Sequence, residues 1–133
     1  MKRVTFVDAS VLIAAARGSD QLSERALQVL TDESRVFATS EFVRLEVLPK
    51  AIHYNYRAER EFYESFFADA RLWADAGSIL RQAFELAVRH GLSGFDALHV
   101  AAAISVGAEE LITAEKKEKP LYRVPMPRVV SIG

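Results

Sequence analysis

Four acidic residues stand where short apolar segments of the chain meet helices or turns. Asp8 ends the first β-rich run, and Glu115 closes a later one near the C-terminus. Glu46 lies inside a predicted helix among apolar neighbours, and Asp96 lies in the first turn of another helix. In open parallel sheets, ligands bind beyond the carboxyl ends of the strands. We therefore expect these four carboxylates to meet in one pocket.

The chemistry of such a pocket follows from its charge. Converging carboxylates repel one another and raise one another's pKa unless a cation neutralises them. The chain has no cysteine, and its histidines do not have the spacing of metal ligands. Ligation by oxygen alone selects hard cations such as Mg²⁺ or Mn²⁺. A bound ion of this kind orients and activates water at a phosphate group, so the pattern predicts phosphoryl chemistry.

Each acid also has a structural explanation. Asp8 can be the N-cap of a helix or a turn residue, and Asp96 completes a capping box that begins at Ser93. Capping and ligation are compatible, because one carboxylate offers several lone pairs. Glu46 is the hardest to explain this way, since its apolar neighbours predict a buried side chain with too few partners. Glu115, beside two lysines, can be an ordinary solvated acid.

The elements that must position these acids alternate along the chain. Predicted strands span residues 3–8, 35–39, 110–113 and 128–132, and predicted helices span residues 10–17, 19–33, 41–51, 57–68, 76–90 and 93–107. We expect Ser10 to cap the first helix and Pro49 to kink or end the third. Strands separated by helices predict a parallel sheet covered on both faces, which is a three-layer α/β/α sandwich.

The composition is that of one globular domain, and we expect residues 1–133 to form it. Half of the residues are hydrophobic and 26% are charged, with a net charge of −1, which excludes a polycation or an acidic tail but not a local basic groove. Without cysteine, disulfides, zinc–cysteine sites and thiol catalysis are excluded. No apolar run is long enough for a membrane span or a signal peptide. We therefore expect a cytoplasmic protein with no membrane partner.

Four segments resemble the motifs of the PIN-domain ribonucleases, especially the toxin subunits of VapBC-type toxin–antitoxin pairs. They are residues 6–13, 39–47, 91–103 and 109–115. The most specific is 91–103, GLSGFDALHVAAA, which is similar to the Asp-Ala-Leu/Ile-His-x-Ala helix of that family. The likeness runs over residues 4–115 in the family's order and spacing. It implies a sandwich with a mostly parallel sheet of about five strands.

The resemblance also implies roles for single residues. Asp8, Glu46, Asp96 and Glu115 would form an acidic quartet, with Asp8 and Asp96 as the principal metal ligands and Glu46 as a ligand or water-orienting base. Glu115 stands where Asp is commoner, so it would serve as an outer or second-metal ligand. Ser10 and Thr113 would be supporting hydroxyls, and His99 would pack or hydrogen-bond beneath the site.

The activity implied by the resemblance is endonucleolytic cleavage of RNA with Mg²⁺ or Mn²⁺, leaving 5′-phosphate and 3′-hydroxyl ends. RNA needs positive charge around the acids. Residues that lie near the site in sequence and can line a basic groove are Arg44, Lys50, Lys116, Lys117, Lys119 and Arg123. For the lysines at 117 and 119, a solvated surface stretch explains the charge equally well.

An unusually rich aromatic set lies in the middle of the chain: Tyr54, Tyr56, Phe62, Tyr63, Phe66 and Phe67. We expect it mainly to pack in the core. The alternatives are a homodimer face or a hydrophobic groove that receives a helical peptide of an antitoxin. An antitoxin partner is an implication of the resemblance.

Two other functions fit parts of the pattern. A PIN-like fold that binds RNA or protein without cutting it is compatible with the departure at Glu115. A phosphoacceptor domain is the third possibility, but a haloacid-dehalogenase-like phosphatase has a second Asp where this chain has Ser10, and a response-regulator receiver has paired acids where this chain has Asp8 and Ala9. The metal-dependent ribonuclease remains the leading prediction.

Overall fold

The computed structural model describes residues 2–18 and 20–133. Its strands are β1 (Arg3–Val7), β2 (Arg35–Thr39), β3 (Leu72–Trp73), β4 (Glu110–Thr113) and β5 (Arg128–Ser131). Its helices are α1 (Ala9–Arg17), α2 (Gln21–Leu30), α3 (Glu41–His53), α4 (Arg57–Asp69), α5 (Ala76–His90) and α6 (Gly94–Ser105), with a short 3₁₀ turn, η1, at Pro120–Arg123.

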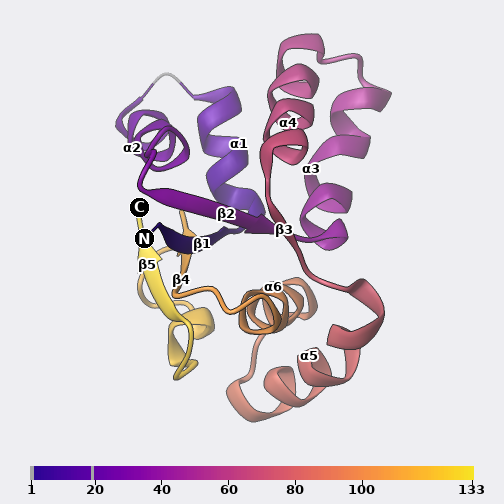
Figure 1. Ribbon diagram of the computed structural model, residues 1–133, viewed down its shortest axis with the longest axis vertical. Coiled ribbons are helices and arrows are strands. Elements are labelled where there is room, and N and C mark those ends of the chain that lie inside the picture. Colours follow the sequence, from indigo (N-terminus) through magenta and orange to yellow (C-terminus); the bar gives the residue numbers. More distant parts are fainter. Residues whose placement is uncertain (1, 19) are drawn as a thin grey trace.

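The five strands form one parallel sheet in the order β3-β2-β1-β4-β5. Helices α1 to α4 lie on one side of the sheet, and α5 and α6 lie on the other (Figure 1). This arrangement confirms the predicted α/β/α sandwich. Strand β1 pairs with β2 on one side and with β4 on the other. The residue that follows β1 therefore lies at the middle of the sheet's carboxyl edge.

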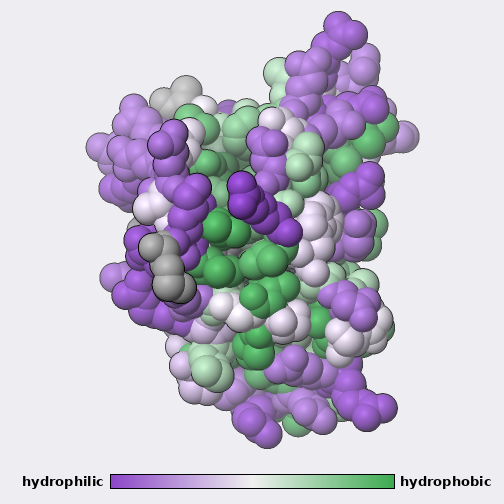
Figure 2. Space-filling view, in the orientation of Figure 1, coloured by the Kyte–Doolittle hydropathy of each residue, from purple (hydrophilic) through white to green (hydrophobic). Residues whose placement is uncertain are grey.

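The core is densest around β1, β4 and α6. Phe6, Val7, Leu111 and Ile112 are buried in the two central strands. Helix α6 is buried on most sides, and many of its buried residues are alanines, whose small side chains permit close packing: Ala97, Ala101, Ala102 and Ala103. Figure 2 shows hydrophobic residues gathered between the sheet and α6, with hydrophilic residues around them. No helix in the described ranges is long and apolar enough to span a bilayer.

Side-chain caps fix where the site helices begin. The Ser40 hydroxyl accepts hydrogen bonds from the backbone N–H groups of Phe42 and Val43, and the Ser93 hydroxyl accepts one from Asp96. Both caps agree with the sequence pattern. The predicted cap of the first helix was wrong: α1 begins at Ala9, and its cap is the Asp8 carboxylate rather than Ser10.

Other differences arise where local signals are weak. Helix α3 continues through Pro49 to His53, so the prediction that Pro49 could end it was wrong. The proline leaves the carbonyl of Leu45 without its helical donor, and Leu45 lies on the exposed side of α3, where water can replace that donor. Strand β3 was not predicted, because it has only 2 residues and exists through its pairing with β2. Helix α2 is shorter than predicted, and the predicted start at residue 19 lies outside the described residues.

The aromatic set divides into two groups. Tyr63 and Phe67 are buried, and Phe62 and Phe66 pack partly buried against the same core, as predicted. Tyr54 and Tyr56 are exposed at the turn between α3 and α4, where their rings stack with centroids 5.7 Å apart. The core explanation therefore accounts for the residues of α4.

Charged residues gather at the amino edge of the sheet, around the buried Glu110. Its carboxylate accepts hydrogen bonds from Arg35 and, at 3.1 Å, from both Arg128 and the Thr5 hydroxyl, and Arg3 lies 3.7 Å away. Burial acts to raise the pKa of Glu110, but the hydrogen bonds and charges of Arg128 and Arg35 outweigh it and hold the pKa below its ordinary value. These contacts arise from strand register, since Arg3 pairs with Arg35 and Glu110 pairs with Arg128.

Candidate active site

Asp8 lies at the centre of the carboxyl edge, directly after β1 and at the start of α1. Its side chain is buried, with the residue 4% exposed, and it accepts a 3.0 Å hydrogen bond from the Ser10 backbone N–H and another from the Ser10 hydroxyl. Burial raises the pKa of the Asp8 carboxyl above its ordinary value, although the hydroxyls of Ser10 and Thr113 act to lower it. The side chain is thus oriented by hydrogen bonds but is not neutralised.

Hydroxyl groups connect the ends of β1 and β4. The oxygen of Ser10 lies 3.3 Å from that of Thr113 and accepts a 2.9 Å hydrogen bond from the Ala114 backbone N–H. The Thr113 hydroxyl accepts a 3.0 Å hydrogen bond from the Glu115 backbone N–H. The predicted supporting residues Ser10 and Thr113 therefore lie beside Asp8 and join the two strand ends.

Asp96 approaches the same place from the opposite layer. It lies in the first turn of α6, where Ser93 caps the helix, and its side chain is half-buried. Its negative charge acts to raise the pKa of Asp8, so the two carboxylates are within electrostatic reach of each other. The α6 cap therefore aims an acid at the end of β1.

Glu46 and His99 form a close pair between α3 and α6. The Nε2 atom of His99 lies 2.6 Å from the Oε1 atom of Glu46. An ionised carboxylate only accepts hydrogen bonds, so Nε2 is the donor, and the buried Nδ1 atom has no partner among the described residues. The His99 ring is held between Phe6 and Phe95, with ring centroids about 6 Å from each. His99 is thus fixed in the core while it reaches Glu46.

The prediction of a buried Glu46 with too few partners was wrong. Its side chain is 31% exposed, and it has His99 as a partner. The reason is the direction of the α3 face: Val43, Val47 and Ala51 point into the core, and Glu46 lies between that face and solvent. The prediction rested on the mostly apolar neighbours Phe42, Val43 and Lys50 at i±3 and i±4, but of these only Val43 is buried, so Glu46 lies at the border of the core face.

Glu115 is positioned through its backbone. Its carbonyl accepts hydrogen bonds from the hydroxyls of Tyr122 and Ser131, at 2.9 Å and 2.8 Å. These contacts hold the turn after β4 against η1 and β5. Within residues 2–18 and 20–133, the Glu115 carboxylate forms no hydrogen bond or ion pair with Asp8, Glu46 or Asp96.

The carboxylate oxygens at this edge are suitable ligands for a divalent cation, but the described side chains do not form a complete metal site. Asp8 and Asp96 would supply oxygen ligands, and burial raises the pKa of the Asp8 carboxyl, which a bound cation would lower. In the described part of the chain, no three Asp, Glu or His side chains form a group that could hold a metal ion. Glu46 is turned toward His99 instead. The fit of this edge to a divalent cation therefore depends on Asp8 and Asp96 and on the polar groups around them.

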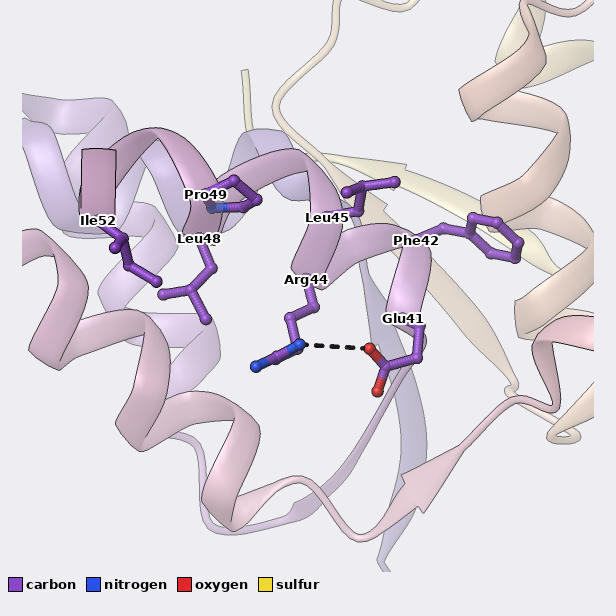
Figure 3. A pocket seen from close by; sticks show the side chains of 7 residues that line it. All are labelled: Glu41, Phe42, Arg44, Leu45, Leu48, Pro49 and Ile52. Carbon is purple, nitrogen blue, oxygen red and sulfur yellow. Dashed lines mark ion pairs between the residues drawn. The ribbon is translucent and has the colours of Figure 1, made fainter. Parts of the chain in front are cut away.

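The predicted basic residues lie in different surroundings. Lys50 and Lys116 are exposed, whereas Arg44 pairs with Glu41 at 3.6 Å in a groove along α3. Figure 3 shows this pair, and the apolar side chains that line the groove of about 300 Å³ with it: Phe42, Leu45, Leu48, Pro49 and Ile52. The sequence analysis missed this groove, although the helical spacing of Leu45, Leu48 and Ile52 signals an apolar face.

Comparisons with known proteins identify the family of this chain and several solved structures with the same fold. The PIN domain family model matches residues 5–125. VapBC2 from Rickettsia felis, solved bound to a DNA fragment from its promoter, superimposes with a TM-score of 0.70 at 15% identity, covering 98% of this chain and 99% of that one. A toxin–antitoxin complex from Klebsiella pneumoniae gives 0.72 at 23% identity, covering 96% of each chain.

A further match is the VapC20 toxin from Mycobacterium tuberculosis, described as cleaving the sarcin–ricin loop. It gives a TM-score of 0.64 at 24% identity and covers 80% of this chain and 86% of that one. A comparison with curated protein sequences found no match. At these identities the structural likenesses establish a shared fold, and any shared activity has to be argued from the site.

Proposed function

Because the chain belongs to the PIN domain family, we propose that it is a metal-dependent endoribonuclease and the toxin of a toxin–antitoxin pair. The observation that carries this proposal is the burial of Asp8 at the centre of the carboxyl edge of the sheet, beside the hydroxyls of Ser10 and Thr113 and within electrostatic reach of Asp96. Solved structures that share the fold are described as VapBC or toxin–antitoxin complexes, and one is described as a toxin that cleaves the sarcin–ricin loop.

In this proposal Asp8 and Asp96 hold Mg²⁺ or Mn²⁺. The ion, when bound, would lower the pKa of a water molecule and stabilise negative charge on the scissile phosphate. Ser10 and Thr113 keep the Asp8 carboxylate in one orientation, since Ser10 donates to it and Thr113 lies 3.3 Å from Ser10. Glu115, anchored through its backbone, would serve as an outer ligand.

The proposed role of Glu46 is to orient the attacking water, and that of His99 is to position Glu46. His99 is buried, so its contact with Glu46 limits the directions that the carboxylate can take. Glu46 is also partly exposed, and its second oxygen is available to accept a hydrogen bond from a water molecule. The reaction would leave 5′-phosphate and 3′-hydroxyl ends.

Substrate and partner would use adjoining surfaces around this edge, which share Arg44. The exposed Lys50 and Lys116, with Arg44, would attract the RNA backbone, and binding should weaken as salt concentration rises. The apolar groove along α3 would receive an amphipathic helix of an antitoxin. The absence of cysteine agrees with a reducing, cytoplasmic compartment.

One observation favours a second candidate, a PIN-like module that binds RNA or protein without cutting it. No three acids are grouped as a metal site in the residues that the structure describes. The ribonuclease and the non-cutting module differ in whether their activity depends on the charges of Asp8 and Asp96. A cutting enzyme loses its activity when either charge is removed, whereas a binding module has no cleavage to lose.

The deciding experiment is cleavage of a structured RNA by the purified chain with Mg²⁺, with Mn²⁺ and with a chelator, followed by mapping of the ends. We expect 5′-phosphate ends with either ion, and a loss of about a hundredfold or more with Asp8→Asn or Asp96→Asn. The exposed Glu109→Gln variant is the matched control and should retain activity. Metal-independent binding without cleavage would support the non-cutting module instead.

A further inference from the structure

Phe95 is an exposed aromatic residue beside one of the two proposed metal ligands. It lies in the first turn of α6, directly before Asp96, and 42% of it is exposed to solvent. Its ring contacts the buried His99 one turn along the helix, with the ring centroids 6.0 Å apart. His99 in turn contacts Glu46. Phe95 and the partly exposed Glu46 are therefore held by the same side chain.

The start of α6 does not depend on an aromatic ring at this position. The Ser93 hydroxyl caps the helix. Leu92 and Ala97, at the two positions that form a hydrophobic staple, are both buried. Phe95 belongs to neither device, and its contact with His99 needs only a large apolar side chain, which a leucine would supply. The aromatic character of Phe95 is therefore not explained by the fold of this segment.

Helical geometry places Phe95 on the side of the site that faces α3. Phe95 and His99 are four residues apart and share a face of α6, whereas Asp96 lies about 100° round the helix from Phe95. Because His99 contacts Glu46 of α3, the shared face is directed toward α3. The Cα atoms of Phe95 and Asp96 are about 3.8 Å apart, as in any trans-linked pair. A group that rests on Phe95 thus lies beside a phosphate bound at Asp96.

We propose that Phe95 stacks against an unpaired base of the RNA, in the nucleotide next to the phosphate that is cut. This inference rests on the proposed function in taking RNA as the substrate, and it narrows the substrate to single strands and loops. Exposed aromatic side chains bind the bases of single-stranded nucleic acid by stacking on their faces. Double-stranded RNA keeps its bases stacked on one another and is bound through its shape and backbone. Phe95 would therefore select RNA that is unpaired at the cleavage site.

The surroundings of Phe95 favour a base over an apolar side chain of a protein partner. Its chain neighbours are the exposed Gly94 and the half-buried Asp96, and Glu46 lies beyond His99. A base is apolar on its faces and polar at its edges, so it can cover the ring while its edges contact these polar groups and water. Phe95 is also absent from the lining of the apolar groove along α3, the surface proposed for the antitoxin.

The ring is held in place before any RNA binds. His99 is buried between Phe95 and Phe6, with ring centroids about 6 Å from each, so little side-chain freedom remains to be lost when a base stacks. Helix α3, on the same side of the site, carries the exposed Arg44 and Lys50, which would attract the RNA backbone. Stacking and charge would therefore act on the same strand.

The first test measures binding without cleavage. A short single-stranded oligoadenylate, and an abasic strand with the same number of phosphates, are titrated with the full chain in the presence of a chelator. Phe95→Leu should bind the oligoadenylate at least about tenfold more weakly than the wild type does, and the abasic strand equally well. Phe95→Tyr should restore the affinity. Phe84→Leu, at an aromatic residue of α5 that is 71% exposed, is the matched control and should bind as the wild type does.

Pairing the oligoadenylate with oligouridylate should remove the effect of Phe95→Leu, because paired bases are not free to stack. Three results would overturn the proposal: equal affinity of wild type and Phe95→Leu for the single strand, an equal loss of affinity for the abasic strand, or no binding of the oligoadenylate by the wild type. The first of these would leave the exposed ring to an apolar residue of a protein partner.

Cleavage of a hairpin RNA in Mn²⁺ locates the stacked base. Cuts should fall in the loop, beside unpaired bases, and Phe95→Leu should lower kcat/KM there by at least about tenfold, with recovery in Phe95→Tyr. Cuts distributed equally over stem and loop, or an unchanged kcat/KM, would contradict the proposal. If the wild type cuts no RNA but the difference in binding at Phe95 remains, the nuclease proposal fails and the stacking role stands.

Discussion

Glu110 and Asp8 are both buried carboxylates on neighbouring central strands, but Glu110 begins β4 at one edge of the sheet and Asp8 follows β1 at the other. Glu110 is surrounded by Arg3, Arg35 and Arg128, and its contacts with Arg128, Arg35 and Thr5 hold its pKa below the ordinary value against the effect of burial. Asp8 receives hydrogen bonds from Ser10 but pairs with no arginine among residues 2–18 and 20–133, and burial raises its pKa.

The difference shows how one fold separates stability from chemistry. At the amino edge the chain supplies its own cations, so the negative charge is satisfied once the strands are in register. At the carboxyl edge Asp8 lies within electrostatic reach of Asp96, and in the proposed function a bound cation would neutralise their charge. The first edge should therefore respond to substitution in stability and the second in activity.

The largest effect on stability is expected for Glu110→Gln. The change removes the buried charge that Arg35 and Arg128 share, although Arg35 keeps its 3.0 Å pair with Asp32, and it should lower the free energy of unfolding by about 3 kcal/mol. Asp8→Asn should not lower it, because the removed charge is one that the fold disfavours. Urea denaturation of both variants checks the comparison, and Glu109→Gln, at the exposed neighbour of Glu110, serves as the control. Equal losses of unfolding free energy in Asp8→Asn and Glu110→Gln would contradict the proposed difference between the two edges.

A smaller effect is expected at the His99–Glu46 pair, and it should appear in catalysis. If His99 positions Glu46, as the proposed function requires, His99→Ala should lower kcat by about ten- to a hundredfold and change KM by less than about twofold. His99→Gln, which can still donate to the carboxylate, should recover part of the loss. Measured values of kcat and KM test this role of His99. If the loss came from a packing defect alone, His99→Gln would not recover kcat.

The two edges should also differ in the sign of their pH dependence. Glu110 has a lowered pKa in the folded chain, so its stabilisation is complete above its ordinary value of 4.5 and is lost as the pH falls through the folded value. Asp8 has a raised pKa, so its contribution is greatest below 3.8 and is lost as the pH rises through the folded value. Unfolding free energies of wild type, Glu110→Gln and Asp8→Asn across this range give the two slopes. Slopes of the same sign would refute the contrast.

The smallest effect should come from Arg128→Ala. The Arg128 side chain is 69% exposed, so water screens its pair with Glu110, and Arg35 remains in contact with the carboxylate. We expect a loss of less than about 1 kcal/mol in the free energy of unfolding. A loss as large as that of Glu110→Gln would show that Arg128, rather than the buried Arg35, is the main partner.

The sequence predicted the features that depend on local signals. Ser40 and Ser93 cap helices as expected, because capping uses residues within three positions of one another. The strand ends at Asp8 and Thr113 were also predicted, because both residues stand at the end of a short apolar run. The parallel sheet followed from the alternation of these elements.

Features that depend on register and on helix direction were not predictable. The Glu110 cluster depends on strand register, which pairs Arg3 with Arg35, Glu110 with Arg128 and Glu110 with Thr5, and no spacing in the sequence indicates this register. Strand β3 is defined by its pairing with β2. The contact of Glu46 with His99 joins residues 53 positions apart on helices in different layers. Each of these depends on how the layers pack.

The central claim is that Asp8 and Asp96 at the carboxyl edge of the sheet bind a divalent cation. Its most direct test is the binding of Mn²⁺ to the folded chain, measured by titration calorimetry. We expect the wild type and Glu110→Gln to bind the ion, with Asp8→Asn and Asp96→Asn each binding it at least about tenfold more weakly. Binding that is equally strong in all four proteins, or absent from the wild type, would contradict the account.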